Sequence, residues 1–184
     1  QDDFTGTEPN KGLSSSSAGS LWFSGLSIPI GGVDIDWEGN LWVADRGNHR
    51  VLRFPKVGEN ISSEADLVLG QPDFQSNSPG IGLTGLRSPG DVEIDPIRRL
   101  VYVSDRRRDV NSRILVYRAP FSDGMAAYDH ISGSVTDPEN YIYQLELDSR
   151  THGLWIRYRF GTVELVDLET RETVVSIAPD FEGP

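Results

Sequence analysis

Apolar and polar residues alternate in two segments of the chain, Val33–Asp36 and Val92–Asp95. This period of two is that of a β-strand with one buried face. Each segment is followed by a short turn and then by an aromatic and β-branched run, Leu41–Asp45 or Val101–Asp105. Runs of this kind favour strands. The pattern therefore predicts two antiparallel hairpins of similar sequence.

Further apolar runs extend these hairpins into larger units. Arg50–Phe54 and Arg113–Tyr117 predict a third strand in each unit, and Ala65–Gly70 predicts a fourth strand that closes the first unit. In the first hairpin turn, Gly39 supplies the positive φ that a Cβ would penalise. Four short antiparallel strands per unit are the composition of a propeller blade.

A third unit can be aligned with the first two. Leu145–Asp148 matches the alternating segments, His152-Gly153 takes the turn, and Leu154–Ile156 matches the aromatic run. A predicted hairpin of 162–168 and 173–177 completes the unit. The repeat distances are 59 residues (33 to 92) and 53 residues (92 to 145). Both exceed the roughly 40–45 residues of a compact blade, so long loops are expected.

We therefore predict an all-β fold, a portion of a β-propeller with three four-stranded antiparallel blades. The predicted divisions are a connecting arm from a preceding blade (1–30), two regular blades (31–74 and 75–133) and a degenerate third blade (134–184).

Three blades leave two blade faces uncovered, because closed propellers need about four to eight blades. The box Gln1–Phe4 also repeats as Gln71–Phe74, which follows the outer strand of a blade. We expect either a longer polypeptide or two associated copies that close one ring. The position of the box favours the longer polypeptide.

Composition narrows the classes of partner. The formal charge of −11, from 28 acidic and 17 basic residues, repels nucleic acid and anionic lipid. The absence of cysteine excludes disulfides and thiolate metal sites. No apolar run approaches the roughly 18 residues that span a bilayer. We expect no nucleic-acid partner and no membrane insertion.

The first unit resembles the NHL-repeat family of β-propellers. The resemblance is carried by Asp45–Val51 after a Leu-Trp-Val strand, by Gly32–Asp36 and by Phe54-Pro55. The box Leu67–Phe74 resembles the GQPDF-type spacers of bacterial exported NHL proteins. The resemblance implies a six-bladed propeller and a secreted or cell-surface location; composition also allows a cytoplasmic one. Relatives bind proteins or RNA, and more distant six-bladed propellers are lyases or lactonases.

The other units depart from the family pattern. Asp105–Arg113 carries three extra residues and lacks the Gly-Asn-His core, and Tyr158 replaces the aspartate in the third unit. In the first unit the repeat signature residues are Asp45, Asn48, His49 and Arg50. We interpret them as structural, since an Asp at a strand end can bind an Arg and backbone donors on the next strand.

Three acidic residues occupy equivalent positions on the predicted innermost strands: Asp34, Glu93 and Glu146. This channel acidic ring could line a polar channel or hold Ca²⁺, which takes oxygen ligands. Alternatively, each carboxylate is hydrated or accepts N–H groups of the neighbouring blade. We favour the structural interpretation and predict no metal site or cofactor. Asp36, Asp95 and Asp148 are interpreted as turn caps.

Two features are candidate binding sites. Arg106, Arg107 and Arg108 form a positive loop whose guanidinium forks suit carboxylate or phosphate recognition. Trp37 lies at a predicted hairpin turn, where we expect it to be exposed and available for contact.

The favoured function is a non-enzymatic interaction or structural scaffold module in a larger extracellular or cell-surface assembly. Its expected partners are proteins or further propeller blades. The alternative is a propeller enzyme of the lyase or lactonase kind, with a divalent metal in the central channel. No catalytic residue is predicted.

Overall fold

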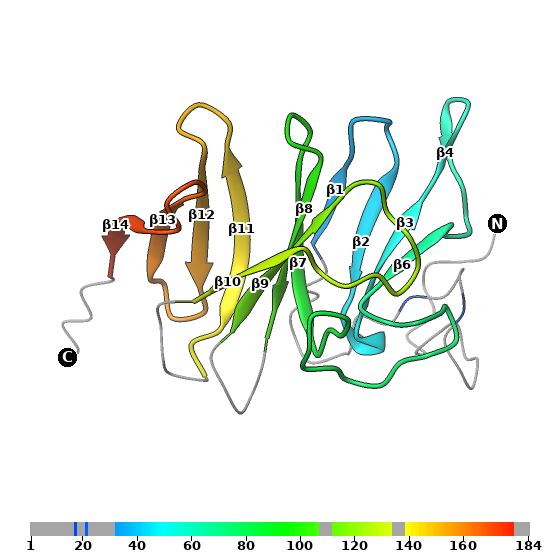
Figure 1. Ribbon diagram of the computed structural model, residues 1–184, viewed down its shortest axis with the longest axis horizontal. Helices are drawn as coiled ribbons and strands as arrows, with labels where there is room; N and C mark the ends of the chain where they lie inside the picture. Colours follow the sequence, from blue (N-terminus) through cyan, green and yellow to red (C-terminus); the bar gives the residue numbers. More distant parts are fainter. Residues whose placement is uncertain (1–16, 18–20, 22–31, 107–111, 134–138, 179–184) are drawn as a thin grey trace.

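The computed structural model describes residues 17, 21, 32–106, 112–133 and 139–178. Its strands form three four-stranded antiparallel sheets that stand side by side like blades (Figure 1), which confirms the all-β class. The first sheet comprises β1 (Val33–Ile35), β2 (Leu41–Asp45), β3 (Arg50–Phe54) and β6 (Leu67–Leu69). The second comprises β7 (Pro89–Asp95), β8 (Leu100–Asp105), β9 (Arg113–Arg118) and β10 (Asp129–Ser132). The third comprises β11 (Ile142–Asp148), β12 (Gly153–Tyr158), β13 (Val163–Asp167) and β14 (Thr173–Ile177).

The strand register gives the three blades a common numbering. Val33 pairs with Val43, Val92 with Val103 and Leu145 with Ile156, always between the first and second strands. Counting two residues on from Val43, Val103 and Ile156 makes Asp45, Asp105 and Tyr158 equivalent. Positions related in this way are called repeat-equivalent below.

Two elements were not apparent in the sequence pattern. A small hairpin of β4 (Lys56–Val57) and β5 (Asn60–Ile61) projects between β3 and β6. In the second blade the outer strand β10 lies ten residues beyond β9 and pairs with it antiparallel. Within the described ranges no helix is long and apolar enough to cross a membrane.

Apolar residues between neighbouring blades form the two main cores. One core joins the first and second blades, and its members include Trp42, Leu69 and Val103, all fully buried. The other joins the second and third blades and includes Ile114 and Leu154. The middle blade is therefore buried on both faces, which explains why β8 and β9 are apolar almost throughout.

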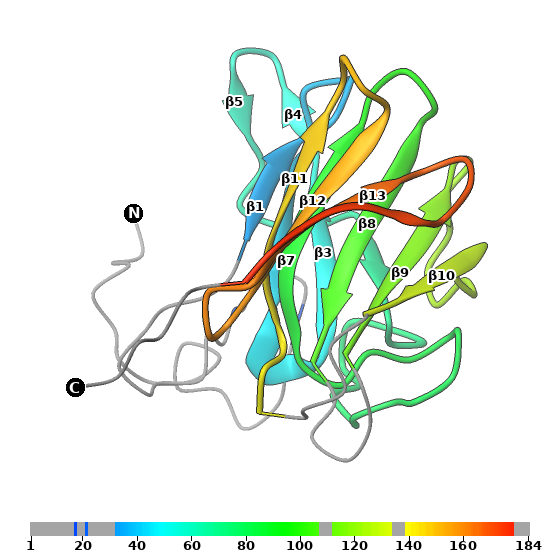
Figure 2. The same ribbon diagram turned by 90° about the vertical axis from the view of Figure 1, so that its left-hand side faces the viewer.

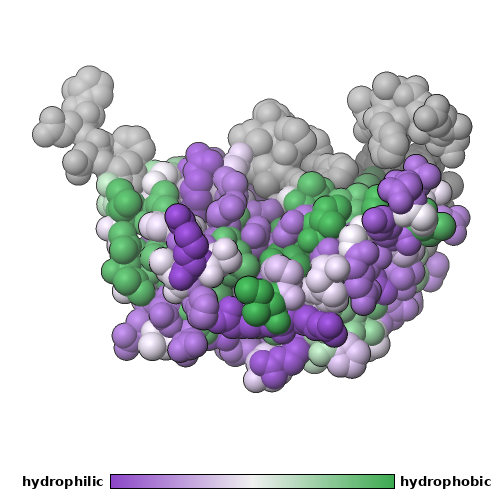
Figure 3. All heavy atoms as spheres, turned by 90° about the horizontal axis from the view of Figure 1, so that it is seen from above, coloured by the Kyte–Doolittle hydropathy of each residue, from purple (hydrophilic) through white to green (hydrophobic). Residues whose placement is uncertain are grey.

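The first strands of all three blades run in the same direction. The turns between first and second strands lie along the upper edge in Figure 1, so the second strands end along the lower edge, here called the loop face. Figure 2 views the blades end-on, with the first strands β1, β7 and β11 away from the outer strand β10. Figure 3 looks onto the upper edge, where polar residues cover most of the surface and an apolar strip marks the end formed by the third blade.

Candidate functional site

The signature residues of the first blade form a buried polar cluster. Arg50 Nε lies 2.7 Å from Asp45 Oδ2, and both side chains are fully buried. Asn48 Nδ2 donates to the same oxygen at 2.9 Å. The remaining Arg50 nitrogens donate to the carbonyls of Phe74 at 2.5 Å and Ser17 at 2.9 Å. The cluster therefore fixes segments that enter and leave the blade.

The second blade repeats this arrangement with different loop residues. Arg113 Nη2 lies 2.9 Å from Asp105 Oδ2 and donates to the Gly85 carbonyl at 2.8 Å. Arg113 Nη1 donates to the Ile81 carbonyl at 2.9 Å. Burial raises the pKa of Asp105, while hydrogen bonds from Ser88 and Arg87 act in the opposite direction. The ion pair thus survives the three-residue insertion in the sequence motif.

The third blade replaces the ion pair with a neutral donor. Tyr158 occupies the repeat-equivalent position of the aspartate, and its hydroxyl donates to Glu164 Oε2 at 3.0 Å. Both residues are buried.

His49 lies at the turn between β2 and β3. Its backbone is left-handed, with φ of 56°, and its carbonyl accepts a 2.9 Å hydrogen bond from Gln71 Nε2. Burial lowers the pKa of His49. Gln71 Nε2 also donates to the Ser78 carbonyl at 2.8 Å, so the spacer box secures the turn and the following loop.

The acidic ring residues connect consecutive blades. Asp34 Oδ2 accepts the Ile94 N–H at 2.8 Å, and Glu93 Oε1 accepts the Leu147 N–H at 3.1 Å. Ile94 and Leu147 are repeat-equivalent, so the same contact occurs at both blade junctions. Glu146, the third member, lies on β11 and is exposed.

Asp91 is an additional acidic contact that the repeat comparison of the sequence missed. Its Oδ2 accepts the Leu145 N–H at 2.7 Å. Burial raises the pKa of Asp91 to about 6 and that of Glu93 to about 7, and the neighbouring charges of Asp34 and Glu146 act in the same direction. The first blade has Gly32 at the repeat-equivalent position, so sequence alignment alone does not single Asp91 out.

The geometry assigns these carboxylates to backbone recognition. Across the described stretches, no group of three or more His, Asp or Glu side chains is arranged to hold a metal ion. Asp34 and Glu93 instead use their oxygens on the strands of the next blade. A Ca²⁺ site at the ring would have to compete with these hydrogen bonds.

The predicted contact residues have different surroundings. Trp37 is half-buried, contrary to the exposure expected at a hairpin turn, because Phe121 packs at 6.1 Å between ring centroids and Arg99 lies over the indole. Arg106 has a side chain only 14% exposed. The Arg106 guanidinium carbon lies 3.7 Å from the Tyr141 ring centroid. The other two arginines of the predicted positive loop, Arg107 and Arg108, lie outside the described residues.

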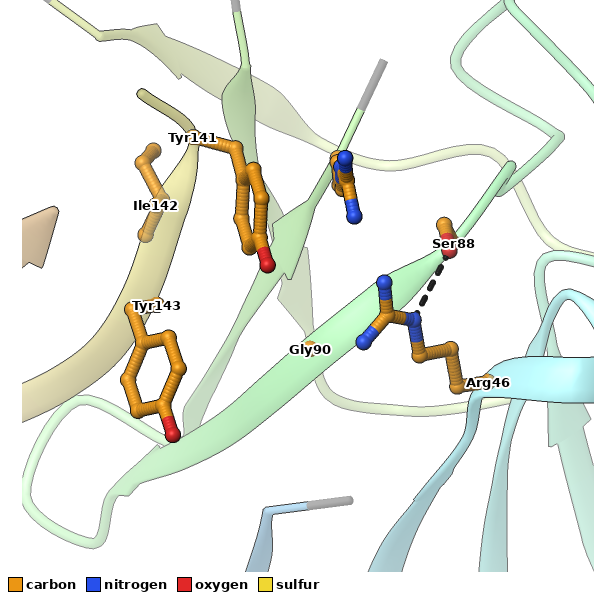
Figure 4. Close-up of a pocket in the computed structure, with 7 residues that line it drawn as sticks. Arg46, Ser88, Gly90, Tyr141, Ile142 and Tyr143 are labelled. Carbon is orange, nitrogen blue, oxygen red and sulfur yellow. Dashed lines mark hydrogen bonds between the residues drawn. The ribbon is translucent and has the colours of Figure 1, made fainter. Parts of the chain in front are cut away.

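A regularity of the arginines was missed. Arg46, Arg106 and Arg159 are repeat-equivalent, each directly after the second strand of its blade. The printed sequence shows this once Tyr158 is aligned with Asp45 and Asp105. Arg46 and Arg106 line a shallow depression on the loop face together with Ser88, Tyr141 and Tyr143 (Figure 4).

A repeat-family match and a solved propeller structure agree with this architecture. Residues 30–54 match the NHL repeat. The WD40 domain of coronin from Toxoplasma gondii superposes with a TM-score of 0.54 at 15% identity, over 91% of this protein and 39% of that one. A polypeptide of a nidogen–laminin complex gives a TM-score of 0.33 at 16% identity, over 90% and 92% of the two proteins. The chain is thus a partial β-propeller built from repeats, and it spans about two fifths of the coronin domain.

Proposed function

We propose that this partial β-propeller is a non-enzymatic protein-interaction or structural scaffold module within a larger extracellular or cell-surface assembly. Propeller repeat domains commonly mediate protein interactions. The extracellular placement rests on the resemblance of the Leu67–Phe74 box to the spacers of exported bacterial NHL proteins.

The open blade faces at the two ends carry the proposal. Val33 and Ile35 on β1 are 58% and 50% exposed, whereas their repeat-equivalents Val92 and Ile94 are 1% and 4% exposed. At the other end, β14 exposes Val174 and Ile177. Apolar faces of this kind mark interaction surfaces. We expect further blades or a protein partner to cover them.

Glu146 gives this expectation a specific contact. At two blade junctions the repeat-equivalent carboxylate accepts an N–H from the first strand of the following blade. Glu146 carries the same acceptor on the exposed first strand of the third blade, β11. A following blade would supply that donor.

The metal-dependent enzyme receives no comparable support. It needs several ligands that converge on the channel, and the available carboxylates bind backbone N–H groups instead.

The test is the denatured and native mass of the protein, measured from the cell-surface or secreted fraction of its source. A denatured mass above 20.4 kDa supports further blades in one polypeptide, and a native multiple of 20.4 kDa supports association. A denatured and native mass of 20.4 kDa, without a bound partner, would contradict the proposal.

A further inference from the structure

The depression on the loop face collects residues from three blades. Arg46 comes from the turn after β2, Ser88 and Arg106 belong to the second blade, and Tyr141 and Tyr143 lie at the start of β11. It is open to solvent and encloses no space large enough for a water molecule. A depression this shallow suits a protruding group of a larger partner better than a whole small molecule.

Arg46 offers hydrogen-bond donors to this depression. Its Nε donates to Ser88 Oγ at 3.0 Å, and that bond fixes the guanidinium across the start of β7. Among the residues that the structure describes, no carboxylate lies within ion-pair distance of Arg46. Figure 4 shows the guanidinium and the hydroxyls of Tyr141 and Tyr143 facing the same space from opposite sides of β7.

Arg106 and the tyrosines supply a rigid wall. Arg106 stacks over the Tyr141 ring at 3.7 Å, and Arg157 lies 5.2 Å from the Tyr143 ring centroid. Stacked guanidinium groups lose little freedom when they bind, and their fork matches a planar oxyanion.

The protein itself shows which anion suits these arginines. Glu139 Oε2 lies 3.1 Å from Arg159 Nη1 and 3.8 Å from Arg106 Nη2, and the glutamate side chain is 61% exposed. A carboxylate therefore already bridges two of the three repeat-equivalent arginines. A phosphate dianion would meet greater repulsion, because the protein carries a net charge of −11.

We propose that Arg46, Arg106, Tyr141 and Tyr143 bind a single carboxylate group of a protein partner on the loop face. This inference rests on the interaction function proposed above and names the chemistry of the partner. The carboxylate comes from an acidic side chain or from the C-terminus of the partner. In either case it binds between Arg46 and Arg106 and accepts hydrogen bonds from the tyrosine hydroxyls.

Fluorescence anisotropy of labelled tetrapeptides with the intact protein tests the site. The probes are tetraglutamate with an amidated C-terminus, tetraglutamine with a free C-terminus and tetraglutamine amide. Saturable binding of the first identifies glutamate carboxylates as the ligand, and binding of the second alone identifies the C-terminus. Equal or absent binding of all three overturns the proposal. Tighter binding of a phosphoserine tetrapeptide than of tetraglutamate overturns the choice of carboxylate.

Variants locate the binding. Arg46→Gln is expected to weaken binding roughly tenfold, because it removes a charge-assisted hydrogen-bond donor. Arg150→Gln removes the same charge from a side chain 90% exposed at the opposite edge, and it should leave binding within about twofold. Equal losses in both variants would show a non-specific charge effect and overturn the site.

Two milder variants separate binding from folding. Tyr143→Phe keeps the ring and removes the hydroxyl, so weaker binding with an unchanged melting temperature supports the site. Glu139→Gln removes the internal carboxylate and is expected to strengthen binding severalfold. Unchanged binding in both variants overturns the proposal. These binding results test the carboxylate site alone. The mass measurement separately tests whether further blades or copies cover the open blade faces.

Discussion

Carboxylates of similar sequence context differ in pKa because their surroundings differ. Burial alone would raise the pKa of Asp36, but hydrogen bonds from Trp42 Nε1 and Asn40 outweigh it, and the pKa lies below its ordinary value. Glu93 has a single 3.1 Å backbone donor and acidic neighbours. Its pKa is raised to about 7. The balance between burial, which raises the pKa of both groups, and hydrogen bonding, which lowers it, decides the direction.

The buried ion pair of the first blade makes a clear stability prediction. Asp45→Ala leaves the fully buried Arg50 charge without its partner, so we expect a loss of about 3–5 kcal/mol in the free energy of unfolding. The control is Asp148→Ala, whose partner Arg150 is 90% exposed and whose ion pair spans 3.5 Å. Urea unfolding of both variants measures the difference, and equal losses would contradict the structural role of Asp45.

The raised pKa of Glu93 predicts a pH dependence. Its pKa rises from an ordinary value of 4.5 to about 7 in the folded protein, so the folded state binds the proton more tightly. This contribution to stability is full below pH 4.5 and is lost as the pH rises through 7. The pKa of His49 is lowered from its ordinary value of 6.5, which has the opposite effect on stability. Its contribution is lost as the pH falls below 6.5.

A comparison of wild type with Glu93→Gln isolates the effect of Glu93 on the pH dependence of stability. His49 and all other titratable groups are the same in the two proteins. Glutamine keeps an acceptor for the Leu147 N–H. We expect its melting temperature to rise relative to wild type between about pH 5 and pH 8, measured by circular dichroism. Parallel pH curves for the two proteins would contradict the assignment.

Neighbouring first strands approach closely at Gly32. Its N–H donates to the Gly90 carbonyl at 3.0 Å across the blade junction. A Cβ at this position would lie 1.6 Å from Asp91 Oδ1 and 2.7 Å from Asp91 Cα. The glycine is therefore required by the packing of two strands and not by a turn.

Gly32→Ala should consequently separate β1 from β7 and cost roughly 1–3 kcal/mol or more of unfolding free energy. Gly82→Ala is the matched control, because a Cβ there meets no atom within 4 Å. Chemical denaturation of both variants gives the comparison. A tolerated Gly32→Ala would show that the junction is looser than described.

The strands themselves differ in how well the pattern predicted them. Alternation and the aromatic runs identified β1, β2, β7 and β8, because these strands carry one repeated set of side chains. The outer strand β10 carries Asp129 and His130 and has no apolar run. Its position depends on pairing with β9, which supplies hydrogen bonds irrespective of side-chain type.

At the scale of the molecule, the end faces define how blades associate. The two internal junctions each bury an apolar core and add a carboxylate-to-backbone contact. Glu146 is the repeat-equivalent carboxylate that the proposed third junction would use.

Glu146→Ala should weaken the native assembly, since it removes the acceptor for the next first strand. Glu169→Ala removes an equal charge from the exposed β13–β14 turn and should not. Sedimentation velocity at several concentrations measures both, with the native mass as readout. If the source protein proves to be one longer polypeptide, the same pair is compared by thermal unfolding. Identical behaviour of the two variants would show that Glu146 does not contribute to a blade junction.

The sequence by itself determined the all-β class, the repeated blade unit and the equivalence of Asp45, Asp105 and Tyr158. These are local patterns, because strand period and turn residues depend on near neighbours in the sequence. Tertiary structure alone decided that Asp34 and Glu93 bind the next blade, that Trp37 is half-buried under Phe121, and that Arg46 and Tyr143 share one depression. Those contacts join residues about 50 to 100 positions apart, whose distance in space depends on blade packing and not on local pattern.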